Sequence, residues 1–217
     1  MDERSSLAPR GRHAPPLEVR LDRQRRRLFA AAAAVFARNG YSDATAEGIA
    51  REAGMSKATF YEHFDNKEDC IVALFEAAIS VVIAAMRAAG DALPDASPQA
   101  RVRAITEGFL GAIAQFPNEA QTVLVEIVGA GPRAMEQRDR ALDAVARYID
   151  ELNRADAERG VAPRLASPHD AFAIVGAVVE LASRQIRTGR PSEMAELEPV
   201  VERLILGLLQ TASDTPA

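Results

Sequence analysis

Large apolar residues recur at every third or fourth position along most of this chain, and no segment alternates apolar and polar residues with a period of two. A spacing of three to four keeps side chains on one face of an α-helix, whereas strict alternation is typical of a half-buried strand. Capping residues, prolines and glycines interrupt the pattern and divide it into segments of helical length. The sequence therefore predicts an all-α fold of nine helices without a sheet.

Local signals place the starts of these helices. Serine, threonine or asparagine stands where a side-chain cap is needed, and proline occupies the first helical position in several cases. The expected helices begin near Leu21, Thr45, Ser56, Asn66, Ser97, Pro117, Leu142, Ser167 and Val201. We expect the first to stop at Asn39–Gly40, where glycine can adopt a left-handed conformation. The fourth is long, about 20 residues or roughly 30 Å at the rise of an α-helix.

Composition excludes several classes of protein. The chain has one cysteine, Cys70, and three histidines, which excludes an internal disulfide or a cage of several histidines. Cys70 lies in an apolar stripe, which favours a small core residue over an oxidant sensor. The uncharged apolar stretches 28–37 and 77–86 are shorter than the roughly 18 residues that cross a bilayer, and the N-terminus lacks the apolar segment of a secretory signal. We therefore expect a cytoplasmic protein without membrane contact, metal or cofactor.

Charge is divided unevenly along the chain. Residues 1–67 hold 12 Lys and Arg against 9 Asp and Glu, whereas residues 68–217 hold 14 against 22. The net charge of −5 thus combines a basic N-terminal third with an acidic remainder. Such asymmetry favours a nucleic-acid-binding module joined to a part with another task. A solvated basic helix start is the alternative interpretation of the same charges.

These patterns divide the chain into three parts. Residues 1–19 contain three prolines and few large apolar groups, which predicts a flexible basic arm. Residues 20–66 form a basic domain, within which residues 45–64 have the form of a helix-turn-helix: two short helices joined by a turn that contains Gly54. In such a motif the second helix enters the major groove of DNA. Residues 67–217 form the remaining helical domain.

The segment AGMSKATFYEHFDNKED, residues 53–69, carries a specific resemblance. Within residues 20–75 the chain is similar to the N-terminal signature of TetR/AcrR-type transcriptional regulators. The resemblance implies a nine-helix TetR-type fold, with an N-terminal helix-turn-helix domain and a C-terminal helical bundle for ligand binding and dimerisation. The remainder of the chain resembles that family only in the number and length of its helices.

The resemblance also implies roles for individual residues. Residues 56–63 correspond to the recognition helix, with Lys57 and Thr59 at base edges or nearby phosphates. Tyr61 and His63 match the family's phosphate-contacting pair, and phosphate contacts position such a protein on the duplex. The full set of residues expected at the DNA is Thr45, Ser56, Lys57, Thr59, Tyr61, His63 and Lys67.

Three features of this region qualify the resemblance. Glu62, within the recognition helix, either accepts from a cytosine amine or, as we favour, faces away from the DNA. The arginines between residues 20 and 27 either enter a minor groove or remain solvated charge. Gly48 stands where the family usually has a polar side chain, and glycine inside a helix costs about 1 kcal/mol relative to alanine.

The later helices supply candidates for a ligand pocket and a dimer interface. The expected pocket is mainly apolar, with a few polar groups that orient the ligand; its candidates are Met86, Phe109, Gln115, Phe116, Val123, Glu126, Tyr148 and Asn153. The eighth and ninth helices are apolar over more than one face, so that one face can pack inside the subunit and another against a second copy. A central helix of a monomer is the alternative. The candidate interface residues are Phe172, Val175, Val179, Leu204 and Leu208.

These expectations combine into one functional hypothesis. The chain is a homodimeric transcriptional regulator, and we favour a repressor over an activator. It binds double-stranded DNA at a pseudo-palindromic operator and is released by a small, largely apolar effector. No catalytic pair stands out, and Gly129–Gly131 lacks the strand and the spacing of a phosphate-binding loop, so we do not expect an enzyme. The alternatives are a helical carrier or enzyme whose helix-turn-helix binds no DNA, and an adaptor that responds to no effector.

Overall fold

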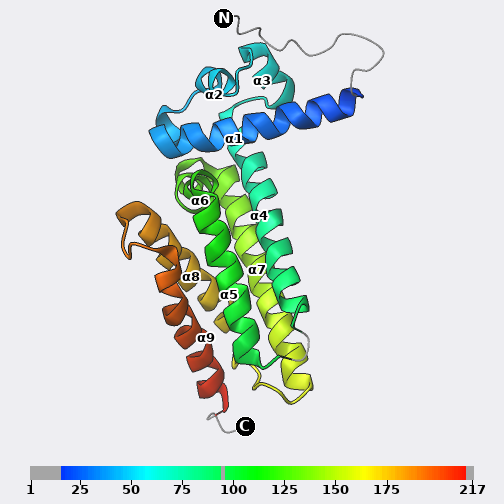
Figure 1. The fold of residues 1–217 in the computed structure, drawn as a ribbon, viewed down its shortest axis with the longest axis vertical. Helices are drawn as coiled ribbons and strands as arrows, with labels where there is room; N and C mark the ends of the chain where they lie inside the picture. Colours follow the sequence, from blue (N-terminus) through cyan, green and yellow to red (C-terminus); the bar gives the residue numbers. More distant parts are fainter. Residues whose placement is uncertain (1–15, 94–95, 214–217) are drawn as a thin grey trace, which may run out of the picture.

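The computed structural model describes residues 16–93 and 96–213 and confirms the all-α prediction. These residues form nine α-helices and two short 3-10 helices, with no strand. Figure 1 shows two parts, with α1–α3 at one end and an elongated bundle of α4–α9 below α1. In chain order the helices are α1 (Leu17–Asp43), α2 (Ala46–Glu52), α3 (Lys57–His63), α4 (Lys67–Asp91), α5 (Pro98–Gln115), α6 (Pro117–Leu124), η1 (Glu126–Gly129), α7 (Pro132–Glu158), α8 (Pro168–Thr188), η2 (Met194–Leu197) and α9 (Glu198–Ser213).

Helix α1 is longer at its start than expected and breaks where expected. It begins at Leu17 instead of Leu21, so residues 17–19 are helical and do not belong to an arm. Residues 1–15 of the expected arm lie outside the described residues. The helix loses its regular dihedral angles at Gly40, whose φ of +76° is easy for glycine and costly for other residues. The break at Asn39–Gly40 is therefore a property of the sequence itself.

A core of fully buried side chains joins α1, α2 and α3. Phe36, Ile49 and Phe60 are completely buried, and Phe64 is nearly so. The rings of Phe60 and Phe64 pack with their centroids 5.4 Å apart. The same core continues to Cys70 on α4, where burial raises the pKa of the thiol to about 12. A buried, protonated thiol fits the predicted core role of this cysteine.

Helices α4, α5 and α8 begin at the caps that the sequence predicts, whereas α7 begins at Pro132, well before the expected Leu142. The side chains of Asn66, Ser97 and Ser167 each accept a hydrogen bond from a backbone N–H in the first turn of α4, α5 and α8. Helices α4 and α7 run the length of the bundle, with α5 beside them and α8 and α9 on one flank (Figure 1). The bundle thus offers several long helix faces between which side chains can be buried.

The length argument against a membrane-spanning helix does not hold for α4. Helix α4 is long and apolar enough to cross a bilayer by length and composition. The sequence analysis counted only uninterrupted uncharged runs, and a single Glu76 divides the apolar stretch between Ile71 and Met86. The core helix of a soluble protein passes the same test, and in this structure α4 packs against α5 and α7. We therefore treat α4 as a helix of the bundle.

Candidate functional site

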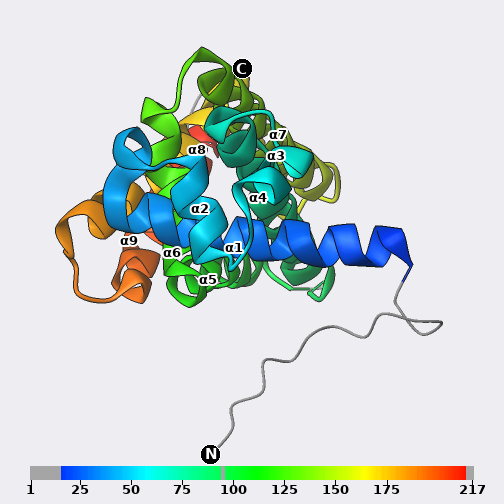
Figure 2. The same cartoon turned by 90° about the horizontal axis from the view of Figure 1, so that it is seen from above.

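Helices α2 and α3 lie on the side of α1 that faces away from the bundle (Figure 1), and Figure 2 views them from that end. Gly54, with a φ of +64°, makes the turn between them. The hydroxyl of Ser56 then accepts from the backbone N–H of Thr59 at 3.1 Å and starts α3. Helix α3 therefore leaves one side open to solvent at the tip of the molecule, as entering a major groove requires.

Several residues expected at the DNA are exposed at this tip. Thr45, Ser56, Lys57 and Tyr61 are all exposed, and Tyr61 keeps 48% of its surface in contact with solvent. The Lys57 ammonium lies 3.9 Å from the carboxylate of Glu47 in an exposed pair. Exposed pairs of this kind contribute little, so the ammonium can exchange its partner for a phosphate. The structure thus brings four of the predicted residues to one accessible surface.

Two other predicted residues of α3 are less exposed. Thr59 is half-buried, and its hydroxyl lies 3.0 Å from that of Ser56. His63 lies against α1, with Nε2 3.4 Å from Oε1 of Gln24. Burial, followed by the neighbouring charge of Arg25, lowers the pKa of His63 below its usual value of 6.5. The imidazole is therefore neutral at pH 7 and adds no charge to the surface.

Lys67 occupies a different environment from the one expected. Its ammonium donates to the carbonyl oxygens of Tyr41 at 2.7 Å, Ser42 at 2.9 Å and Ala44 at 3.1 Å. Carbonyls at the end of a helix lack partners within it, and the break at Gly40 leaves these three for the lysine. Lys67 thus fastens α4 to the end of α1, and in this structure its ammonium is engaged within the protein. We call residues 41–44 the α1 junction.

The arginines between residues 20 and 27 lie within α1 and do not form an extended arm. The guanidinium of Arg25 lies 5.2 Å from the ring centroid of Phe29 and 5.3 Å from that of Phe64. Arg27 donates to the carbonyl oxygen of Ala53, at the end of α2, at 2.7 Å. Both residues contact the N-terminal core, whereas Arg20, Arg23 and Arg26 are exposed on α1.

The bundle encloses an apolar cavity of about 120 Å³, which we call the main cavity. Its walls come from α4–α9 and are almost entirely aliphatic or aromatic, as with Phe75, Ile79 and Val178. Arg138 on α7 is the one charged side chain that lines it, and it makes no ion pair or hydrogen bond with the described residues. Within the described part of the chain no group of three metal-ligating side chains forms. The cavity therefore suits an apolar or amphiphilic ligand.

Three expected pocket residues, Met86, Phe109 and Val123, line the main cavity. Gln115 and Phe116 do not, because α5 ends at Gln115 and both residues lie exposed where α6 begins. The sequence correctly predicts the apolar face of α5 at Phe109 but does not show that the helix ends at Gln115, outside the cavity.

Tyr148 also lies outside the cavity. Its hydroxyl is 3.5 Å from the carbonyl oxygen of Met86, and the guanidinium of Arg87 lies 5.5 Å from its ring centroid. Burial is the main cause that raises the pKa of its hydroxyl above 10.0. The ring therefore packs α7 against α4 instead of facing a ligand.

Glu126 joins the two parts of the molecule. Its Oε2 accepts from the backbone N–H of Tyr41 at 2.8 Å, and its Oε1 accepts from the side chain of Gln121 at 2.9 Å. Lys67 donates to the same α1 junction. Both α4 and the α6–η1 segment are therefore hydrogen-bonded to the end of α1. Sequence reasoning missed this contact, since Tyr41 and Glu126 stand 85 positions apart. Glu126 consequently holds the α1 junction from outside and does not line the main cavity.

A second cavity of about 100 Å³ adjoins the first. We call it the distal cavity, because it lies where α5 begins and α7 ends, away from α1 (Figure 1). Five residues line both cavities, which makes the two spaces neighbours along one path: Ile105, Thr106, Ile149, Ile174 and Ile205.

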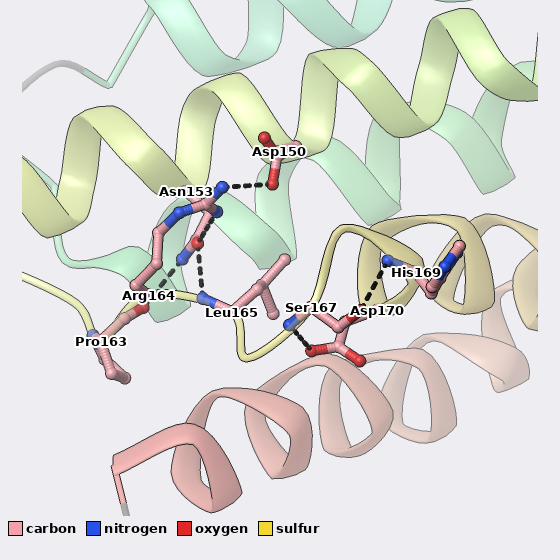
Figure 3. Close-up of polar contacts among 8 residues, drawn as sticks. All are labelled: Asp150, Asn153, Pro163, Arg164, Leu165, Ser167, His169 and Asp170. Atoms are coloured by element: carbon pink, nitrogen blue, oxygen red, sulfur yellow. Dashed lines mark hydrogen bonds and ion pairs between the residues drawn. The ribbon is translucent and has the colours of Figure 1, made fainter. Parts of the chain in front are cut away.

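Asn153 lines the distal cavity, but its amide is engaged elsewhere. Figure 3 shows that its Nδ2 donates to the carbonyl oxygen of Pro163 at 2.9 Å, while its Oδ1 accepts from Arg164 and from the backbone N–H of Leu165, each at 2.8 Å. Arg164 also pairs with Asp150 at 2.7 Å. Asn153 therefore anchors the loop between α7 and α8 and is not free to orient a ligand.

The five expected interface residues have different environments. Val175 is 5% exposed and packs between α7 and α8, so it belongs to the subunit core. Val179 lines the main cavity. Phe172 is 45% exposed on α8, and Leu204 and Leu208 are half-buried on α9. Of the predicted set, Phe172 is the side chain most open to a second copy.

Comparisons with known proteins concern first the N-terminal part. Residues 28–74 match the family model of the bacterial regulatory proteins of the tetR family. The HTH-type transcriptional activator FasR of Mycolicibacterium smegmatis is 30% identical over 108 residues, which are 50% of this chain and 48% of that protein. The fatty acid metabolism regulator protein of Bacillus subtilis is 41% identical over 49 residues, 23% of this chain and 25% of that protein. The chain thus matches about half of the first relative and a quarter of the second.

Solved structures extend the similarity to most of the chain. The transcriptional regulator FadR from Bacillus subtilis, in complex with stearoyl-CoA, superimposes with a TM-score of 0.74 at 20% identity, covering 84% of this chain and 98% of that one. At this level of identity the similarity concerns the fold. It confirms the arrangement of a helix-turn-helix end and a helical bundle.

Proposed function

We propose that this chain, which belongs to the TetR family of bacterial regulatory proteins, is a cytoplasmic, homodimeric transcriptional repressor that a long-chain acyl effector releases from its operator. Residues 20–66 read the DNA, and residues 67–217 sense the effector and form the dimer. The match over residues 28–74 carries the first half of this proposal. The apolar main cavity carries the second.

The DNA-reading role rests on the exposed surface of α3. Tyr61 offers an exposed hydroxyl to phosphate, and Lys57 offers a weakly paired ammonium. In a dimer, two copies of α3 meet successive major grooves about 34 Å apart, or a multiple of that distance, on a pseudo-palindromic site.

The acyl effector is supported by chemistry and by relatives. The main cavity is lined by apolar side chains apart from Thr106 and Arg138. One relative is a regulator of fatty acid metabolism, and the FadR structure holds stearoyl-CoA. A long hydrocarbon chain is the ligand that such walls accept at the lowest desolvation cost.

The size of the cavity supplies the mechanism of release. Ligand sites usually measure about 300–1,000 Å³, well above the about 120 Å³ of the main cavity. An acyl chain therefore has to move the surrounding helices apart. Because Lys67 and Glu126 tie α4 and η1 to the α1 junction, that displacement reaches the DNA-reading end. Release requires only that the effector bind the widened state more tightly.

Fluorescence anisotropy with the full chain tests the DNA-reading role, on a duplex selected from random-sequence DNA. Tyr61→Phe removes the exposed hydroxyl, and we expect it to weaken binding roughly fivefold on all duplexes. Tyr148→Phe, which removes a hydroxyl inside the bundle, is the matched control and should leave DNA affinity unchanged. Absence of binding by the unaltered chain at low salt would favour a carrier, an enzyme or an adaptor instead.

A further inference from the structure

We infer that the N-terminal end of α1 makes a second contact with DNA, in which Arg20 and Arg23 bind the phosphate backbone beside the groove that α3 enters. This inference rests on the proposed DNA-reading role and extends its surface beyond the helix-turn-helix. It makes the bound stretch of duplex longer than α3 alone covers.

The first two turns of α1 project beyond the rest of the molecule, as the two perpendicular views show (Figures 1 and 2). Every residue from 17 to 23 is exposed, whereas Gln24 is half-buried and Leu28 is the first fully buried side chain of the helix. We call residues 17–23 the α1 overhang. This stretch of about 10 Å contributes no side chain to the N-terminal core, so its side chains are available to a partner.

Contacts in the next turn of α1 show which side of the overhang faces the helix-turn-helix. The side chain of Gln24 lies 3.4 Å from that of His63 on α3, and Arg27 donates to the carbonyl oxygen of Ala53 at the end of α2. Successive residues turn by about 100° around a helix, so Arg20 projects between the directions of Gln24 and Arg27. Arg20 therefore points to the side of α1 that carries α2 and α3.

The charges of the overhang are sorted by face. Arg23 lies about 60° from Arg20 around the helix axis, whereas Glu18 and Asp22 both lie about 160° from Arg20. Asp22 pairs with Arg26 at 2.9 Å. Neither Arg20 nor Arg23 makes a side-chain hydrogen bond or ion pair with another described residue. The overhang thus presents two unpaired cations on the side of the helix-turn-helix and keeps its acidic residues on the opposite side.

The dimensions of DNA bring phosphates to these two arginines. Helix α3 packs on α1, and a helix with its side chains is about 10–12 Å across. The major groove is about 8.5 Å deep, so the phosphate strands that border it descend beside α3 to within about 2–4 Å of the surface of α1. An arginine side chain spans such a distance, and its guanidinium matches a phosphate with two parallel hydrogen bonds.

The backbone is the partner we assign, in preference to the minor groove. The overhang is helical, and the minor groove is about 6 Å wide, roughly half the diameter of a helix. The two contacts also differ in their dependence on sequence. Backbone contacts carry no sequence information, whereas arginines in a minor groove favour A·T-rich stretches, where that groove is narrow.

Salt titrations of DNA affinity with the full chain test this contact. Fluorescence anisotropy is followed on a duplex selected from random-sequence DNA and extended on each side by about one helical turn, roughly 10 base pairs. Each phosphate contact contributes about 0.9 to the slope of log affinity against log salt, so R20Q/R23Q should lower this slope by about 1.8. A fourfold rise in salt then costs the unaltered chain about 12-fold more affinity than it costs the variant. The titrations are made without effector, for which laurate serves as the acyl probe.

R26Q is the matched control, because Arg26 is an exposed cation of the same helix that is already paired with Asp22. Its slope should equal that of the unaltered chain. All three arginines are exposed, so both variants should unfold at the temperature of the unaltered chain. On the selected duplex without its extensions, the unaltered chain should lose the same part of its slope as R20Q/R23Q loses on the extended one.

Three results would overturn the backbone contact and leave reading by α3 intact. These are equal slopes for the unaltered chain and R20Q/R23Q, an equal fall of the slope in R26Q, and an effect confined to A·T-rich extensions. If the unaltered chain bound no duplex at low salt, the proposed DNA-reading role would itself be wrong, and the second contact with it.

Discussion

The DNA-reading end and the bundle bury their side chains in different ways. Around α1–α3, aromatic side chains such as Phe36 and Phe60 are completely buried in a closed core. In the bundle, valine and isoleucine side chains surround two neighbouring cavities, and one of these contains a buried ion pair. A closed core keeps the reading surface in one shape, whereas a core with cavities can be widened by a ligand. The difference supports the proposal that the first part reads DNA and the second responds to a ligand.

The largest effect should come from removing an aromatic ring of the closed core. Phe60→Ala leaves a cavity under α3 and should lower the free energy of unfolding by about 3–5 kcal/mol. Phe172→Ala, at an exposed position on α8, should change it by less than about 0.5 kcal/mol in the monomer. Urea unfolding measures both. Similar losses in the two variants would remove the contrast between the two parts.

Lys67 and Lys57 provide a sharper pair, because one is engaged inside the protein and the other is exposed. Lys67→Met should cost about 1–3 kcal/mol of stability, since three carbonyl groups lose a charged donor. Lys57→Met should leave stability unchanged but reduce the slope of log affinity against log salt by about 1. Salt titrations of DNA binding and thermal unfolding separate the two effects. A reduced salt slope for Lys67→Met would restore it as a phosphate contact.

The buried thiol predicts a specific dependence on pH. Because the folded-state pKa of Cys70 is about 12, above the usual 9.0, the native state holds its proton while the unfolded state loses it. Stability from this group is complete below pH 9 and falls as the pH rises above it, by at most about 1.4 kcal/mol per pH unit. Cys70→Ala should show a shallower fall between pH 9 and pH 10 in urea unfolding. Parallel profiles for the two proteins would mean that the thiol ionises in the folded state.

The smallest effect concerns the junction between the two parts. Glu126→Gln retains the shape of the side chain but replaces the charged acceptor of the Tyr41 N–H, a change worth about 1 kcal/mol. We expect the ratio of DNA affinities without and with effector to fall by roughly fivefold. Anisotropy titrations with and without laurate give this ratio. Glu136→Gln, on the exposed face of α7, is the control. An equal fall of the affinity ratio in this variant would mean that the effect does not depend on the α1 junction.

What the sequence predicts well depends on short-range interactions. The caps at Thr45, Ser56 and Asn66 need only a side chain and a backbone N–H three residues away. The break at Gly40 likewise depends on one residue's conformational range. These features were predictable because no distant part of the chain decides them.

What the sequence does not predict depends on contacts between distant segments. Lys67 meets its carbonyl partners only because the break at Gly40 brings the α1 junction to the start of α4. Val175 lies on an apolar face of α8, but periodicity does not show which apolar face turns inward. The pairing of Arg101 with Asp156 joins the start of α5 to the end of α7 and leaves no local pattern in the sequence.

The most direct test measures DNA binding and effector binding in the same sample. A labelled duplex bound to the full chain is titrated with laurate while anisotropy is followed, and calorimetry under the same conditions shows when laurate is bound. We predict that anisotropy falls to the value of the free duplex over the same concentration range in which laurate binds. A duplex that stays bound to protein saturated with laurate would contradict the coupling between the cavities and α3.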